Sequence, residues 1–251
     1  MPHLADAVRY IEHPDTTEGE LRRACAILAL DDTGPVDALR QRLESYLSRH
    51  DPLRPVACLN PGALPPGLSQ AGPRLGRPDP DEHPSVFAAE IALVPDVDDF
   101  ARLLRDQGDV TRALAATFGE EHAGLRYAPD KWTVREVMGH LSDCERVLSY
   151  RLLRALRADT VTLPGFDHVA YVPAGHFEER ALASVVDELT AVRQATVALV
   201  NGAPVEAFAF RLNVGSGSIT GRALAYLIAG HERHHQALLR DRYMALVPGF
   251  G

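Results

Sequence analysis

The sequence is poor in aromatic residues, cysteine and lysine, and it contains no long apolar run. No stretch of about 18 consecutive apolar residues occurs, which excludes a membrane-spanning helix. The three cysteines are odd in number, far apart and in no CxxC pair, so we expect neither a disulfide framework nor a cysteine-based zinc site. The first residues, Met1 to Asp6, lack the basic and apolar regions of a signal peptide. We therefore expect a cytoplasmic protein.

The composition is typical of a globular protein with an acidic surface. Of the 251 residues, 46% are hydrophobic and 24% are charged, and the formal net charge is −8. This charge opposes a broad electrostatic attraction to nucleic acid. The length predicts one large domain, or one domain together with a small module.

Proline and glycine are concentrated between residues 52 and 84, where Pro61–Gly67 is followed by four further prolines. Proline removes a backbone donor and fixes φ, so neither a helix nor a central strand persists in such a segment. We therefore predict three parts: a small helical module over residues 1–50, a Pro/Gly-rich linker over 51–90 and a helical domain over 91–251.

The first 50 residues are predicted to form two short helices separated by a turn. Capping residues in 16–20 precede an apolar segment over 21–28, Asp31–Pro35 favours a turn, and a second helix follows over 36–47. This arrangement, which ends in Leu39-Arg40-Gln41-Arg42-Leu43, resembles the SAP module, a small nucleic-acid-binding fold. Six arginines against nine acidic residues give residues 1–50 a net charge of −3, and a phosphate-binding surface needs the opposite sign. We therefore predict an interaction module of unknown partner, and DNA binding is the less favoured alternative.

From residue 96 onward the helical period dominates the hydrophobic pattern. It predicts four amphipathic helices, over about 96–119, 133–158, 179–201 and 219–243. Thr133 and Glu136 have the spacing of a capping box, and Trp132 can pack over the first turn as a hydrophobic staple. Because no series of strands is visible, we predict an all-α protein whose main domain is a four-helix bundle.

Most of the eleven histidines, His168 among them, fall in predicted loops, where a solvated histidine is ordinary. The pair His231 and His235 is different, because residues four apart share one face of a helix and two such imidazoles can hold a divalent ion. The spacing alone leaves two alternatives open: a hydrogen-bonded pair without metal, and a register in which His234 faces inward instead. His140 lies on the inward stripe of the second helix, and Asp143 beside it could accept its second ring proton.

Three segments resemble landmarks of the DinB/YfiT-like superfamily. They are the sequence from Tyr127 to Asp143 (YAPDKWTVREVMGHLSD), Leu163-Pro164-Gly165-Phe166-Asp167, and the sequence from Ala229 to His235 (AGHERHH). The resemblance covers about residues 96–245. It implies a four-helix bundle, a homodimer and a divalent metal held by His140, His231 and His235. His234 is then expected to contact one of the ligands or to pack in the core.

The resemblance also implies a class of chemistry, since several characterised relatives are thiol S-transferases. We expect one divalent ion, zinc or nickel, and a low-molecular-weight thiol that reacts with an electrophile in detoxification or stress response. A metal-dependent hydrolase and a non-enzymatic, metal-stabilised interaction module are the alternatives, because all three use the same ligands. Arg193 and Tyr150 could contact the carboxylates of a thiol, although surface or packing roles are favoured, and Cys144 is interpreted as a small buried filler.

Overall fold

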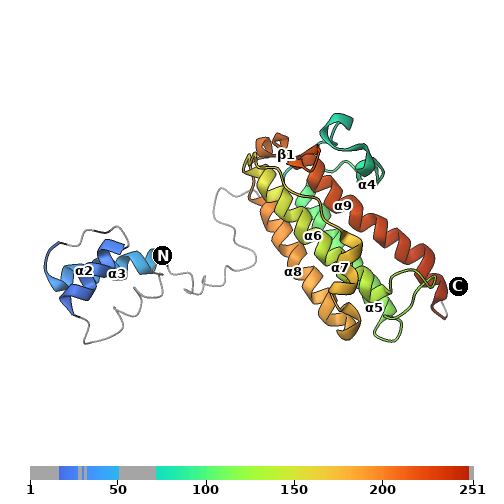
Figure 1. Ribbon diagram of the computed structural model, residues 1–251, viewed down its shortest axis with the longest axis horizontal. Coiled ribbons are helices and arrows are strands. Elements are labelled where there is room, and N and C mark those ends of the chain that lie inside the picture. Colours follow the sequence, from blue (N-terminus) through green and yellow to red (C-terminus); the bar gives the residue numbers. More distant parts are fainter. Residues whose placement is uncertain (1–16, 28–29, 31–32, 51–71, 249–251) are drawn as a thin grey trace. The chain divides into compact units, whose positions relative to one another are not determined.

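The computed structural model describes residues 17–27, 30, 33–50 and 72–248 (Figure 1). The chain divides into two compact units, residues 1–68 and residues 69–251. Within the described residues, no helix combines the length and the apolar character that crossing a membrane requires.

The first unit contains two helices, α2 (Glu18–Ile27) and α3 (Val36–His50). Leu21 and Cys25 of α2 are buried against Leu39 and Leu43 of α3, which gives the pair a small apolar core. Gly34 in the connection has a φ of 98°, a conformation that favours glycine. The two predicted helices are confirmed, while residues 1–16, 28–29 and 31–32 of the predicted module lie outside the described residues. The resemblance to a SAP module stays a prediction.

The second unit is built around four long helices: α5 (Phe100–Phe118), α6 (Val134–Leu156), α8 (Leu182–Asn201) and α9 (Gly221–Leu238). α8 and α9 each pack against both α5 and α6. α5 therefore lies diagonally opposite α6, and α8 lies diagonally opposite α9 (Figure 1). The predicted all-α four-helix bundle is confirmed. The capping box is also present, because the Glu136 amide donates to the Thr133 hydroxyl and the Thr133 amide donates to the Glu136 carboxylate.

The core of the bundle consists of two apolar clusters. One contains residues near 100–104, 148–156, 197–200 and 223–229, and the other contains residues near 115–118, 134–141, 182–189 and 239–243. Near the level where the two clusters meet, each helix carries buried polar side chains: Gln107 and Thr111 of α5, His140 and Glu145 of α6, Arg193 and Thr196 of α8, and Glu232, His235 and Gln236 of α9. A polar layer therefore crosses the middle of the bundle.

The linker predicted over 51–90 is wrong in its second part. Residues 72–92 contain two short turns of 3₁₀ helix, η1 (Pro80–Glu82) and η2 (Ser85–Phe87), followed by α4 (Ala88–Ala92), which packs against α9 (Figure 1). Leu75 and Ile91 are buried in the first apolar cluster, and the buried Glu82 carboxylate accepts hydrogen bonds from Arg222 and Thr220. The prolines interrupt regular structure here, but apolar and charged side chains between them still attach the segment to the bundle. Residues 51–71 lie outside the described residues.

Two elements between the long helices are absent from the sequence-based expectation. Residues 211–220, too short for a further helix, form an antiparallel hairpin of β1 (Arg211–Val214) and β2 (Gly217–Thr220), and Gly215 at its turn has a φ of 56°. The predicted loop after α6 contains a short helix, α7 (His168–Ala174), whose first amides are capped by the Asp167 carboxylate. The last helix continues from α9 into a π-helical turn, η5 (Leu239–Tyr243).

Candidate metal centre

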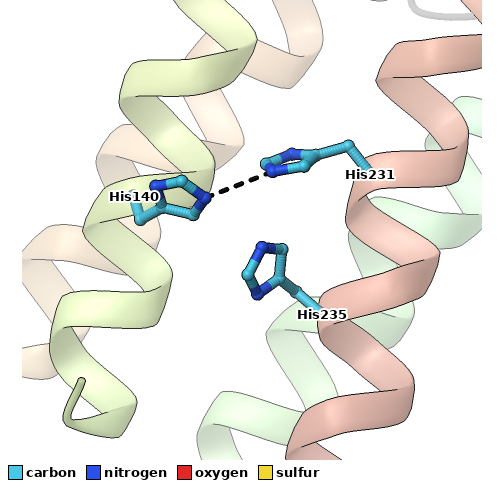
Figure 2. A group of neighbouring side chains, drawn as sticks. All are labelled: His140, His231 and His235. Carbon is cyan, nitrogen blue, oxygen red and sulfur yellow. Dashed lines mark hydrogen bonds between the residues drawn. The ribbon is translucent and has the colours of Figure 1, made fainter. Parts of the chain in front are cut away.

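Three imidazoles meet on one side of the polar layer, between α6 and α9. His140 comes from α6, and His231 and His235 come from successive turns of α9, with all three rings directed toward a common space (Figure 2). A ligand atom from each of the three lies within 4.8 Å of the other two. Nε2 of His140 and Nε2 of His231 lie 3.2 Å apart. The three residues that we predict as ligands are thus brought together by the fold.

The protonation state of these imidazoles suits metal binding. Burial lowers the pKa of His140 to about 4, with a further contribution from His168. Burial, followed by the other histidines, lowers the pKa of His231 to about 3 and the pKa of His235 well below its usual range. Neutral imidazole is the form that coordinates a metal, so at neutral pH no proton has to be displaced.

Two further observations show that a divalent ion fits the site. Two nitrogens that each lie about 2.0–2.1 Å from a tetrahedral ion are separated by about 3.3 Å, which is close to the 3.2 Å between His140 and His231. In addition, Nδ1 of His235 is buried and has no hydrogen-bond partner. A buried imidazole nitrogen without a partner is costly, and an ion in this space or a bound ligand would offset that cost. The histidines could therefore hold a metal ion.

The groups next to His140 are partly those expected from sequence. The Trp132 ring, which packs against the second apolar cluster, has its centroid 4.5 Å from the centroid of the His140 ring. The Cys144 sulfur lies 3.6 Å from Nδ1 of His140, and burial raises the pKa of this thiol to about 12. Cys144 therefore keeps its proton at neutral pH and fills space beside the histidine.

The structure gives two predicted neighbours other surroundings than expected. Asp143 lies 3.7 Å from the Arg146 guanidinium, and within the described residues no hydrogen bond connects it to His140. The reason is geometric: Asp143 sits at the edge of the helix face that carries His140, where the arginine on the next turn reaches it. His234 is exposed, and its ring packs edge-on against the His235 ring at 5.1 Å. Of the two roles expected for His234, the structure shows contact with a predicted ligand and does not show a core position.

His168 is a neighbour that sequence reasoning missed. It begins α7, and its ring centroid lies 5.6 Å from that of His140, although the side chain itself is exposed. Asp167 immediately before it is a typical N-cap residue and could have indicated a helix start at this point.

The other side of the polar layer is a buried ion-pair network centred on Arg193. The guanidinium donates two hydrogen bonds to Glu145, at 2.8 and 2.6 Å, and one to Glu232 at 2.7 Å. Burial alone would lower the pKa of Arg193, but the two carboxylates outweigh it and raise the pKa above the usual arginine value. The surface or packing role favoured for Arg193 from sequence thus gives way to that of a buried cation.

The remaining hydrogen-bonding capacity of the network is used by α5. Thr111 and Gln107 donate to the Glu232 carboxylate at 2.6 and 2.9 Å. Gly108 allows α5 to pass close to Arg193, since a Cβ atom at this position would lie 3.2 Å from the arginine Cγ. Because Glu232 follows His231 directly in α9, the network fixes the rotation of the helix that carries two of the three histidines.

A glycine precedes the first histidine on each of the two helices, and each glycine is covered by another segment. A Cβ atom on Gly139 would lie 2.4 Å from the ring of Phe177, and one on Gly230 would lie 2.1 Å from the backbone oxygen of Glu90. Such distances leave no room for a side chain. The two glycines therefore allow neighbouring segments to pack directly on α6 and α9 beside the metal centre.

A cavity of about 270 Å³ adjoins the metal centre on the side of His235. Its walls are mainly aromatic and aliphatic, and Asp130 and Lys131, which form an ion pair at 2.8 Å, lie among its lining residues. The lining residues are Tyr127, Asp130, Lys131, Trp132, Val137, Val169, His235, Leu238 and Tyr243. The cavity is large enough for a small organic molecule beside the imidazoles.

Comparison with solved structures shows what the fold resembles. YfiT from Bacillus subtilis, described as a probable metal-dependent hydrolase with an unusual four-helix bundle topology, is 18% identical and gives a TM-score of 0.52. The alignment covers 59% of this chain and 85% of YfiT. The DinB-like protein YjoA from Bacillus subtilis is 16% identical over 59% of this chain and 93% of its own, with a TM-score of 0.44.

Comparison with curated protein sequences gives no match. The sequence model of the DinB superfamily, in contrast, matches residues 103–239, which include all four long helices from Leu103 of α5 onward and the three histidines. The chain belongs to the DinB superfamily.

Proposed function

We propose that this protein is a metal-dependent enzyme whose ion is held by His140, His231 and His235. The convergence of three imidazoles that are neutral at neutral pH carries this proposal. Three protein ligands leave a coordination position open for water or a substrate, as in catalytic zinc sites and unlike structural ones. Zinc and nickel are the ions we favour, because both bind imidazole well. When bound, such an ion lowers the pKa of a coordinated thiol or water.

The reaction that we propose is thiol S-transfer. The sulfur electron pair of a low-molecular-weight thiol forms a bond to an electrophilic carbon, the bond from that carbon to its leaving group breaks, and the leaving group takes the proton that the thiol loses. The cavity beside His235 supports this proposal, since its aromatic and aliphatic walls suit the organic electrophile.

Hydrolysis is the second candidate. YfiT, whose fold this chain resembles, is described as a probable metal-dependent hydrolase. Water in place of the thiol would use the same three ligands. The two candidates differ in their second substrate: the transferase reaction requires a thiol, whereas hydrolysis proceeds without one.

Metal content tests the first part of the proposal. We expect about one zinc or nickel ion per chain by elemental analysis, and we expect its loss from His140→Ala, His231→Ala and His235→Ala. His234→Ala is the matched control, since it removes an exposed imidazole from the same helix and should leave the metal content unchanged. A wild-type protein that takes up neither ion, or an equal loss from His234→Ala, would refute the ligand set.

Reaction with a fluorogenic electrophile, monochlorobimane, tests the second part. The metal-loaded protein should accelerate its conjugation to a small thiol, and removal of the ion with a chelator should abolish the acceleration. Consumption of ester or amide substrates without added thiol would favour the hydrolase instead. Equal rates with apo and metal-loaded protein would favour the non-enzymatic module.

A homodimer and a partner for the first unit also stay predictions. Sedimentation velocity of the full chain tests the dimer, and a mobility shift with duplex DNA at moderate salt tests the disfavoured nucleic-acid partner.

A further inference from the structure

A second cavity, of about 260 Å³, lies away from the metal centre. It is lined by the η2 segment, α6, the β1–β2 hairpin and α9, with Phe87 and Leu148 among its apolar walls, and it shares no lining residue with the cavity beside His235. Among the described residues that line it, Arg151 is the single charged one. Arg151 follows His140 by eleven residues in α6, which corresponds to about 16 Å along the helix axis. The cavity is therefore separate from the three histidines.

Arg151 is a buried cation without a carboxylate partner. It is 8% exposed, and within the described residues it forms no ion pair, in contrast to the equally buried Arg193 with its two carboxylates. One N–H group of Arg151 donates to the carbonyl oxygen of Pro164 at 3.1 Å, and the guanidinium carbon lies 5.1 Å from the centroid of the Phe166 ring. A guanidinium carries five N–H donors. The other four have no hydrogen-bond partner in the described part of the chain.

The free donors of Arg151 are accessible from the cavity. None of its nitrogens is both fully buried and without a partner, so the free donors reach open space, and Arg151 lines this cavity. Buried charges in proteins are ordinarily paired, and the contact with the Phe166 ring is weaker than an ion pair. Burial lowers the pKa of Arg151, whereas the two carboxylates around Arg193 raise the pKa of that residue. An anion in the cavity would supply the missing partner.

We propose that this cavity binds a small organic molecule with one carboxylate group and an apolar body. The planar guanidinium matches a carboxylate through two parallel hydrogen bonds. A single cation compensates a single negative charge, so a doubly charged phosphate is less well matched to Arg151. The aliphatic and aromatic walls suit a hydrocarbon body. The site needs no ion at the three histidines, and it therefore goes beyond the proposed function.

Isothermal titration calorimetry of the full chain tests the site, with hexanoate and benzoate as probes and hexanamide and benzamide as their neutral counterparts. We expect the amides to bind about 10-fold more weakly than the carboxylates, because they cannot form charge-assisted hydrogen bonds. Arg151→Gln should weaken carboxylate binding about 10- to 100-fold. Arg157→Gln is the control and should match the wild type, since it removes the same charge from an exposed position at the end of α6.

A second variant leaves Arg151 in place, because Arg151 also holds the Pro164–Phe166 segment. Val86 lines the cavity and is 76% exposed, so a polar residue at this position should not disturb the fold. Val86→Asp should bind the carboxylates about 5-fold more weakly than the matched Val86→Asn, because like charges repel. Added salt should diminish this difference, and the two variants should bind the amides equally.

Each outcome supports or refutes the carboxylate site independently of the proposed function. The inference is refuted if the wild type binds neither carboxylate at millimolar concentration, or binds acids and amides equally. If Arg151→Gln retains full affinity, or if Val86→Asp and Val86→Asn bind the carboxylates equally, the probes bind elsewhere and Arg151 only anchors the Pro164–Phe166 segment. Removal of the metal ion with a chelator should leave carboxylate binding unchanged, and its loss together with the ion would assign the probes to the metal centre.

Discussion

Arg193→Met should be among the most destabilising single substitutions in the bundle. The methionine fills much of the arginine volume but removes the cation from a layer in which Glu145 is 4% exposed and Glu232 is 2% exposed. Glu232 keeps hydrogen bonds from Thr111 and Gln107. Within the described residues Arg193 is the single partner of the Glu145 carboxylate, which is left buried and unpaired.

The magnitude follows from the burial of these carboxylates. Removing one partner of a buried ion pair costs about 3–5 kcal/mol of unfolding free energy, because the remaining charge is desolvated without compensation. The matched control is Arg146→Met, which breaks an α6–α8 pair of the same kind with Glu188 at a half-exposed site and should cost about 0–1 kcal/mol. Adding Glu145→Gln to Arg193→Met should recover part of the loss, since it removes the orphaned charge.

The assay is urea unfolding of the apo protein at several pH values. The penalty for a buried, unpaired carboxylate applies to its charged form and is relieved when acid neutralises the charge. The difference between wild type and variant should therefore be largest at neutral pH and should decrease toward about pH 4. A loss below about 1 kcal/mol, or a loss of the same size at all pH values, would refute the assignment of a buried charge network.

Four further predictions concern the metal centre and the helices that support it. Metal affinity, measured against a competing chelator, should stay nearly constant down to about pH 5 and fall at lower pH, because burial lowers the pKa of His140 to about 4. A loss of affinity that begins at about pH 6.5, as expected for ordinary histidines, would contradict the burial of His140. By the same linkage the apo protein should lose stability between about pH 6.5 and 4, where the unfolded chain binds protons that the folded His140 does not. Gly230→Ala should cost about 1–3 kcal/mol in urea unfolding, because its Cβ atom would lie 2.1 Å from the Glu90 backbone oxygen; an unchanged stability would show that α4 does not pack closely on this glycine. Thr133→Ala should remove the cap of α6 and cost about 0.5–2 kcal/mol in thermal or urea unfolding without changing metal content; an unchanged stability would mean that the cap is replaced.

The features that could be predicted from sequence are those that depend on local spacing. The four long helices follow from apolar periodicity, and the Thr133–Glu136 cap follows from two residues three apart. The proximity of His140 to the histidines of α9 could be predicted because these positions fall on inward-facing stripes of their helices. The choice of His235 over His234 required the family pattern.

The features that could not be predicted depend on contacts between distant segments. The partnership of Arg193 with Glu145 and Glu232 joins three helices, and no local pattern distinguishes this arginine from the many exposed ones. α4 follows a proline-rich segment, whose composition indicates a linker. The composition does not reveal that the backbone of Glu90 in α4 packs against Gly230, which is far along the chain. The position of Asp143 was misjudged for a related reason, since helical spacing places it near His140 but does not reveal the competing Arg146.

The two covered glycines beside the ligands offer a way to tune the metal without altering its donors. An imidazole nitrogen lies about 7 Å from the axis of its helix, so a rotation of about 10° moves it by about 1 Å. A methyl group at Gly139 or Gly230 would push against Phe177 or the α4 backbone and exert this torque on one helix at a time. Variation at these two positions could therefore adjust, by small steps, the ion selectivity of the site and the position of a bound thiol or water, while the three histidines stay the same.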